Sequence, residues 1–185
     1  MSTSGIRTKT LCALILSVVL YNSPTQTVQA GCLKGDIVSG GEVHTLVLMD
    51  DKNSTVWACG NNSYQQLGIG DDNDDQMTLT QVLGGEMDSD ILKNIADIDA
   101  GWQHSLALDN DGSLWAWGNN DNGQLGNNSN EPSSIPVQVL SGEQNDEPCV
   151  YLENIVDISA GRSGEHSLAV SSDGYVWAWG RDNAG

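Results

Sequence analysis

The chain has 185 residues and a formal net charge of −18 at pH 7, from seven basic and 25 acidic residues. This length indicates one domain or two small ones. The acidic balance argues against nucleic acid or an anionic membrane as partner, because both need a basic face.

The first thirty residues have the pattern of a secretory signal peptide. Arg7 and Lys9 precede an apolar run over residues 11–20, and a polar stretch ends in Val28-Gln29-Ala30. The run is shorter than the roughly 20 residues that a membrane-spanning helix needs. We therefore expect residues 1–30 to be cleaved, with no membrane insertion afterwards; an uncleaved anchor is the alternative. The expected location is secreted or cell-surface, periplasmic in an organism with an outer membrane.

Cleavage would remove Cys12 and leave Cys32, Cys59 and Cys149. An odd number of cysteines in an exported chain implies a free thiol, a lipidated thiol or a partner in another molecule. Cys32 follows two small residues, as in a bacterial lipobox, but Gln29 stands where a lipobox has leucine. This argues against a lipid anchor at Cys32. Cys59 occupies a repeated tryptophan position and is expected to be a small packing residue.

After the leader, the chain repeats one pattern of two short apolar runs. It occurs loosely over residues 40–60, clearly over residues 100–118, and again over residues 160–180. In the clear copies the runs are joined by Asp-Gly, which favours a hairpin turn. The copies lie about 60 residues apart, and periods of this size are typical of solenoids, propellers and arrays.

Each repeat adds further short strands to its hairpin. In the first, a strand is expected near residues 36–40 and another at 80–83, after the acidic tract 71–75. In the second, the last strand is expected at 137–140, and Pro136 before it fits an edge strand. The predicted units are a signal peptide at 1–30, repeats at 31–93 and 94–153, and a truncated repeat at 154–185.

Four short strands per repeat, glycine-rich corners and the absence of helical periodicity predict an all-β repeat architecture. Trp115 and Trp117 share one face of their strand, and Leu114 and Ala116 share the other. Both faces are apolar, so both should be covered, as when one propeller blade stacks on the next. We predict a partial, open β-propeller of four-stranded antiparallel blades.

The repeats resemble those of the regulator of chromosome condensation repeat family. That family carries Ala-Gly-x-x-His-Ser/Thr-Leu, Asp-Gly, Trp-Ala-Trp-Gly-x-Asn and Gly-Gln-Leu-Gly, and matching residues cover roughly 36–185. The resemblance implies a seven-bladed β-propeller. Cys59, Gln65 and a two-residue insertion within residues 162–165 depart from the pattern and put loop shape in doubt.

Seven repeats of this period would take about 420 residues. We therefore expect this chain to be the N-terminal piece of a longer protein. Alone, it should be marginally stable or prone to aggregate, because terminal blades expose apolar faces.

Residues that recur at the same position of each repeat are expected to have a structural role. Buried polar groups need hydrogen-bond partners, and every blade has this requirement. A cation site formed by the three histidines on a ring axis is the alternative. Asp109-Asn110-Asp111-Gly112 and residues 71–75 do not match an EF-hand, although weak surface calcium binding by the second tract stays open. The positions expected to be structural are His44, His104, His166, Trp57, Trp115, Trp117, Trp177, Trp179, Gly101, Gly118, Gly161 and Gly180.

Trp102 and Tyr64 lie in predicted loops and are the candidate partner contacts, because exposed aromatic side chains anchor protein interfaces.

The sequence contains no convincing Ser-His-Asp arrangement, phosphate-binding glycine loop or carboxylate pair. We therefore expect no enzyme activity and no cofactor or metal. The predicted function is an exported interaction module that binds a protein partner, still unknown, through blade-edge loops. Alternatives are guanine-nucleotide exchange on a small GTPase, implied by the family resemblance, or the targeting domain of a larger extracellular enzyme.

Overall fold

The structure, a computed structural model, describes residues 37–70, 73–142, 150–162 and 164–181. The expected signal peptide, Cys32 and Cys149 lie outside the described residues. Among those residues, we find no helix with the length and apolar character needed to cross a bilayer.

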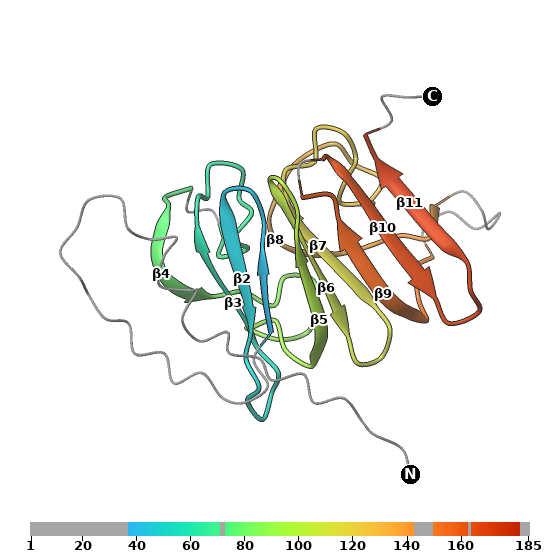
Figure 1. Cartoon of the computed structure of the whole chain (residues 1–185), viewed down its shortest axis with the longest axis horizontal. Helices are drawn as coiled ribbons and strands as arrows, with labels where there is room; N and C mark the ends of the chain where they lie inside the picture. Colours follow the sequence, from blue (N-terminus) through green and yellow to red (C-terminus); the bar gives the residue numbers. More distant parts are fainter. Residues whose placement is uncertain (1–36, 71–72, 143–149, 163, 182–185) are drawn as a thin grey trace, which may run out of the picture. The chain divides into compact units, whose positions relative to one another are not determined.

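The described residues form three antiparallel sheets in which strands adjacent in sequence are hydrogen-bonded neighbours (Figure 1). The first sheet contains β1 (Ile37–Gly40), β2 (His44–Leu48), β3 (Val56–Gly60) and β4 (Gln76–Gln81). The second contains β5 (Ile95–Ala100), β6 (His104–Asp109), β7 (Leu114–Gly118) and β8 (Ser133–Gln138). The third contains β9 (Ile155–Ala160), β10 (His166–Ser171) and β11 (Val176–Gly180). This confirms the all-β prediction of a partial, open propeller.

Two strand boundaries differ from the sequence prediction. The last strand of the first sheet begins at Gln76, before the predicted residue 80, and β8 begins at Ser133, before the predicted residue 137. Pro136 therefore lies inside β8. It is tolerated because β8 is an edge strand, where a missing backbone N–H can face away from the ladder.

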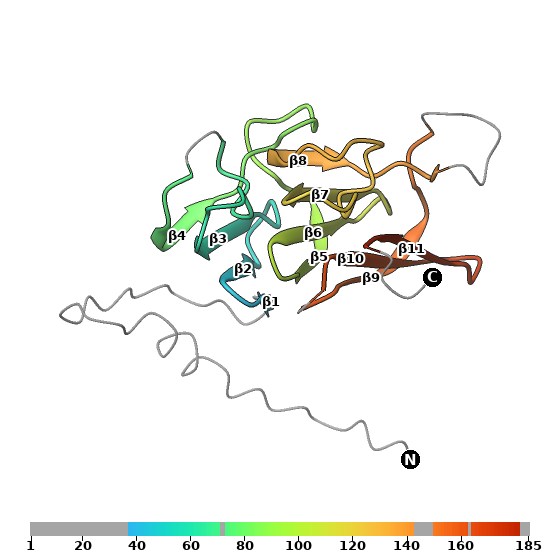
Figure 2. The same ribbon diagram turned by 90° about the horizontal axis from the view of Figure 1, so that it is seen from above.

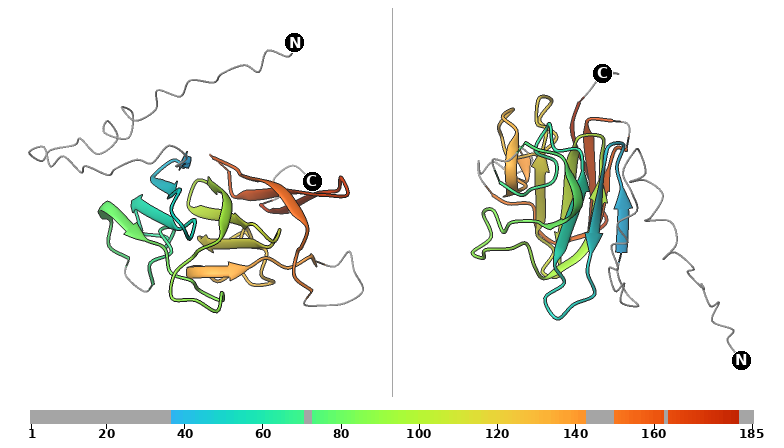
Figure 3. Two further views of the ribbon diagram at one scale, coloured as in Figure 1. Left: turned by 90° about the horizontal axis from the view of Figure 1, so that it is seen from below. Right: turned by 90° about the vertical axis from the view of Figure 1, so that its left-hand side faces the viewer.

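The sheets stack in chain order and enclose two apolar layers (Figure 2, Figure 3). Trp115 and Trp117 face the first sheet, whereas Leu114 and Ala116 face the third. All five residues of β7 are buried. Both faces of β7 are apolar because a neighbouring sheet covers each of them, as the sequence predicted.

Candidate interaction surface

A histidine–serine hydrogen bond joins each pair of neighbouring sheets. His44 Nε2 lies 2.9 Å from Ser105 Oγ, and His104 Nε2 lies 3.0 Å from Ser167 Oγ. Ser105 Oγ itself donates to the Gln66 carbonyl at 2.8 Å. Because a carbonyl only accepts and a hydroxyl has one hydrogen, His44 Nε2 must be the donor to Ser105.

A tryptophan completes each of these connections. Trp117 Nε1 donates to the carbonyl of Gln66 and Trp179 Nε1 to that of Gln124, both at 2.9 Å. Ser167 Oγ donates to the same Gln124 carbonyl, also at 2.9 Å. The carbonyls of Gln66, in the loop after β3, and of Gln124, in the loop after β7, therefore each accept hydrogen bonds from a serine and a tryptophan of the next sheet.

The loop that presents this carbonyl is braced by its own side chains. Gln66 Oε1 accepts from Tyr64 N at 2.9 Å, and Gln66 Nε2 donates to Asn61 Oδ1 at 2.9 Å. Gln65 has φ of 64°, close to the 74° of Gly123 at the equivalent position of the second sheet. The departure from glycine at Gln65 therefore leaves the backbone conformation unchanged and places a non-glycine residue in the left-handed region.

Burial keeps the joining histidines neutral. It lowers the pKa of His44 to about 3, assisted by the nearby His104, and it lowers the pKa of His104 to about 4, assisted by His166. The Nδ1 atoms of His44 and His104 are buried without a hydrogen-bond partner in the described part of the chain. No group of three or more His, Cys, Asp or Glu side chains that could hold a metal occurs among the described residues. His44 Nε2 and His104 Nε2 each bond a serine of the following sheet.

The other repeated positions have local partners. Trp57 Nε1 donates to Thr55 Oγ1 at 3.1 Å and Trp115 Nε1 to Asp109 Oδ2 at 3.2 Å, whereas the indole nitrogen of Trp177 has no partner in the described residues. Gly101 and Gly161 lie against the rings of His104 and His166, where a Cβ would come within 2.8 Å of ring atoms. Gly118 and Gly180 have φ of 104° and 99°, a region that favours glycine.

Cys59, the remaining departure in the repeated tryptophan positions, is a free thiol and half-buried. Burial raises the pKa of this thiol. Cys59 is thus less buried than the prediction of a packing residue implied. Among the described residues, no further sheet packs against the face of the first sheet that carries it.

A carboxylate that the sequence analysis did not single out links all three sheets. Asp99 Oδ1 accepts from Ser39 Oγ at 2.8 Å, and Asp99 Oδ2 accepts from the backbone N–H of Ala160 at 2.7 Å. Ser39, Asp99 and Ala160 lie on β1, β5 and β9, the first strands of their sheets. The repeat pattern gave no signal for this role, because the equivalent positions hold Ser39 and Ser159.

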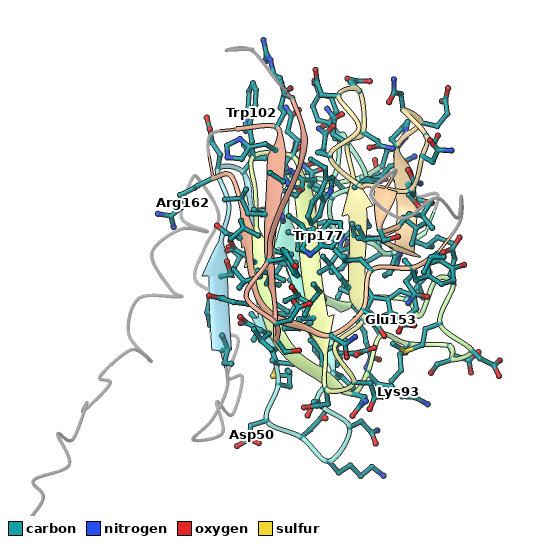
Figure 4. All side chains as sticks on the ribbon, turned by 90° about the vertical axis from the view of Figure 1, so that its right-hand side faces the viewer. Asp50, Lys93, Trp102, Glu153, Arg162 and Trp177 are labelled. Atoms are coloured by element: carbon teal, nitrogen blue, oxygen red, sulfur yellow. The ribbon has the colours of Figure 1, made fainter. Side chains whose placement is uncertain are left out.

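We call the end of the sheets at which β2, β6 and β10 begin the histidine end. Antiparallel pairing brings the loops before these strands and after β3 and β7 to this end. Glu42 N donates to Gly101 O at 3.4 Å and Arg162 Nε donates to Gly40 O at 2.9 Å, so loops of three sheets contact one another here. Figure 4 shows Trp102 and Arg162 at this end and Asp50 and Lys93 at the opposite one.

Both candidate partner contacts lie at the histidine end. The Tyr64 side chain is 42 % exposed, and Trp102 is half-buried in the loop between β5 and β6. Val43, 41 % exposed, adds an apolar side chain from the loop between β1 and β2. The segment 162–165, which contains the two-residue insertion, begins with Arg162, whose exposed side chain is held by its bond to Gly40.

The acidic tract is partly used in loop structure. Asp75 Oδ1 accepts from Asn61 Nδ2 at 3.0 Å and from Asn62 N at 2.9 Å. Asp71 and Asp72 lie outside the described residues. Asp75 thus braces the loop that carries Tyr64.

Two four-stranded antiparallel sheets and one three-stranded sheet, stacked face to face at a period of about 60 residues, define an open β-propeller repeat protein. The family model described as "Regulator of chromosome condensation (RCC1) repeat" matches residues 53–108 and 111–170, and a second model of that description matches residues 36–66 and 95–124. The chain belongs to the RCC1 repeat family.

Curated relatives cover most of this chain. The ultraviolet-B receptor UVR8 of Arabidopsis thaliana is 30% identical over 162 residues, which are 88% of this chain and 33% of the receptor. The protein RCC1 of Candida albicans is 29% identical over 159 residues, 82% of this chain and 33% of that protein. The E3 ubiquitin-protein ligase HERC2 of Mus musculus is 30% identical over 149 residues, 80% of this chain and 3% of the ligase. This chain thus spans a third or less of each of these relatives.

Solved structures show the same fold. Human WBSCR16 matches with a TM-score of 0.60 and 27% identity over 79% of this chain and 33% of its own. Yeast RCC1 (Prp20), solved bound to Kap60, matches with a TM-score of 0.56 and 22% identity over 78% of this chain and 31% of its own.

Proposed function

We propose that this protein is an exported, non-catalytic module that binds a protein partner through the loops of its histidine end. The observation that carries the proposal is the placement of Trp102, Tyr64 and Val43 on loops of this one end. Aromatic side chains on loops held by a rigid scaffold are the usual anchors of protein interfaces.

The chemistry of the described residues favours binding over catalysis. His44 and His104 are neutral, buried and hydrogen-bonded to serines, so they are poor general bases for a bound substrate. Ser105 and Ser167, their partners, are fully buried and donate to backbone carbonyls. These pairs resemble a nucleophile and its base only in composition, since a substrate cannot reach them.

The test is capture of a partner from the cell-envelope or medium fraction of the source organism by the immobilised chain. We expect Trp102→Ala and Tyr64→Ala to reduce capture of one protein at least tenfold, as for interface hot spots. Tyr175→Ala is the matched control, because Tyr175 is 66% exposed in the turn at the opposite end. Equal capture by all three variants would contradict the proposed surface.

Export and the lack of catalysis have separate tests. N-terminal sequencing of the secreted protein should begin at Gly31, after the predicted cleavage site. A nucleotide-exchange assay with small GTPases tests the alternative that the family resemblance suggests, and accelerated exchange would replace our proposal.

A further inference from the structure

We propose that the histidine end recognises a basic segment of its protein partner and holds an arginine or lysine side chain at Trp102, Glu42 and Asp121. This inference rests on the proposed function, because it concerns the chemistry of the same surface. The observation that carries it is a loop that bears Trp102 and is hydrogen-bonded, directly before and directly after the indole, to two loops with exposed carboxylates.

The loop between β1 and β2 places Glu42 against the loop that carries Trp102. Glu42 N donates to Gly101 O at 3.4 Å, and a Cβ at Gly41 would collide with that carbonyl oxygen, so the two loops are in close contact. The Glu42 side chain is exposed. A carboxylate of the first sheet and an indole of the second thus share one part of the surface.

The loop after β7 carries Asp121 and contacts the residue that follows Trp102. Asn119 N donates to the backbone oxygen of Gln103 at 2.9 Å, and Asn119 Nδ2 donates to Gln103 Oε1 at 3.0 Å. Asn119 Oδ1 in turn accepts from Asp121 N at 2.8 Å, which fixes the start of this loop. The Asp121 side chain is exposed. Trp102 therefore lies between the attachment points of both carboxylate-bearing loops.

Neither carboxylate is neutralised within the described part of the chain. Arg181 is paired with Glu165, and the guanidinium of Arg162, at the same end, donates to a backbone carbonyl. Glu42 and Asp121 have no ion-pair partner among the described residues. They are thus available to a cation of another molecule, and the net charge of −18 would steer such a cation toward the chain.

An indole beside carboxylates suits a guanidinium or ammonium group. The face of the indole attracts a cation through its quadrupole, and carboxylates accept the N–H bonds of arginine and lysine. An acidic segment would be repelled by the same carboxylates. Val43 and Tyr64 extend the surface with apolar contacts, which a protein segment can use and a small free cation cannot. A basic protein segment is therefore the occupant.

The first test measures the binding of fluorescent peptides to the purified chain by anisotropy at low salt. The probes are three peptides of equal length, in which glycine alternates with arginine, with serine or with glutamate. We expect the arginine peptide to bind at least about tenfold more tightly than the other two, and to weaken as added sodium chloride screens the charges. Equal affinities, or a preference for the glutamate peptide, would overturn the proposal.

The second test separates this site from the net charge of the chain. The double variant Glu42→Gln/Asp121→Asn should raise the dissociation constant of the arginine peptide about fivefold, as for loss of two surface charge contacts. Asp88→Asn/Glu153→Gln is the matched control, because it makes the same change in net charge with exposed side chains of the β4–β5 and β8–β9 loops. It should change the constant by less than about twofold. Equal losses in both double variants would overturn the site.

The third test addresses the indole. Trp102→Leu keeps an apolar side chain but removes the aromatic face, and it should raise the dissociation constant of the arginine peptide about twofold to fivefold. Tyr175→Leu, in the turn at the opposite end, is the control and should leave the constant unchanged. Equal affinities of the two variants would contradict a cation held against Trp102.

Failure of this inference can be told apart from failure of the proposed function. If the peptides bind equally but Trp102→Ala still abolishes capture of a protein partner, the interaction surface stands and its preference for a basic segment is wrong. If capture is insensitive to Trp102→Ala while the arginine peptide still requires Glu42 and Asp121, the cation site stands and the proposed function is wrong.

Discussion

His44 and Ser105 are 61 positions apart in the chain, yet Nε2 of one lies 2.9 Å from Oγ of the other. The Ser105 hydroxyl in turn donates a hydrogen bond to the Gln66 carbonyl at 2.8 Å, so a histidine and a serine from neighbouring sheets form one buried chain of hydrogen bonds. This geometry makes the sheets depend on each other through polar groups as well as apolar packing.

Removal of the Ser105 hydroxyl should destabilise the protein. In Ser105→Ala the His44 Nε2–H loses its acceptor in a buried position, and we expect the free energy of unfolding to fall by about 1–3 kcal/mol. Urea unfolding followed by tryptophan fluorescence measures this. Ser172→Ala, at an exposed turn position, is the control and should change stability by less than about 0.5 kcal/mol. Similar stabilities for the two variants would show that the hydrogen bond contributes nothing.

Stability should decrease in mild acid because of His44 and His104. Their pKa values in the folded protein, about 3 and about 4, lie below the unfolded value of roughly 6.5, so the unfolded chain binds protons first. The contribution is fully present above about pH 6.5 and is lost as pH falls toward the folded values. Each histidine adds a slope of up to about 1.4 kcal/mol per pH unit within this window.

His104→Gln tests the pH dependence, since the Gln amide can still donate to Ser167 but does not titrate. We expect urea midpoints measured between pH 7 and pH 5 to vary less in this variant than in the wild type. His166→Gln is the control, because the His166 side chain is exposed. An unchanged slope in His104→Gln would contradict burial of a neutral imidazole.

Gly68 should be less tolerant of a side chain than Gly142, although both have positive φ, 69° and 67°. A Cβ at Gly68 would lie 2.8 Å from Trp117 Nε1, whereas a Cβ at Gly142 meets nothing within 4 Å. Alanine at either position adds backbone strain of roughly 1–2 kcal/mol. Only Gly68→Ala also displaces a packed indole, for about 1–3 kcal/mol more. Thermal melts of the two variants compare these costs, and equal losses would exclude a close contact at Trp117.

Ser171→Asp should stabilise the third sheet. Asp109, at the equivalent position of the second sheet, accepts a hydrogen bond from Trp115 Nε1 at 3.2 Å, whereas the buried Trp177 Nε1 has no partner within the described residues. A carboxylate at position 171 would supply that acceptor and raise stability by about 1 kcal/mol. The reverse change, Asp109→Ser, should lower it by a comparable amount. Destabilisation by both substitutions would mean that the two turns differ in shape.

The sequence predicted the stacked sheets because the apolar pattern of β7 has no polar face. It also placed Trp115 and Trp117 on one side and Leu114 and Ala116 on the other, and the two apolar layers confirm this. Strand ends were less predictable, since Gln76 and Ser133 are polar residues whose pairing depends on the neighbouring strand.

The contacts between sheets could not be read from the repeat pattern alone. The recurring histidine indicated a shared structural need, but the pattern did not show that its partner is the serine of the next sheet. Asp99 occurs at one repeat only, and its link to Ser39 and Ala160 depends on the three-dimensional stacking. Arg162 lies in the segment whose length differs from that of the second repeat, so the repeat pattern did not signal its bond to Gly40.

The complete burial of β7 has a consequence for the order in which the molecule comes apart. Among the described residues, the second sheet packs against a sheet on each side, whereas the first and third sheets each pack against one, so we expect amide protons of β6 and β7 to exchange with deuterium last. Local unfolding would then begin in the first and third sheets, and the β6–β7 hairpin would unfold last.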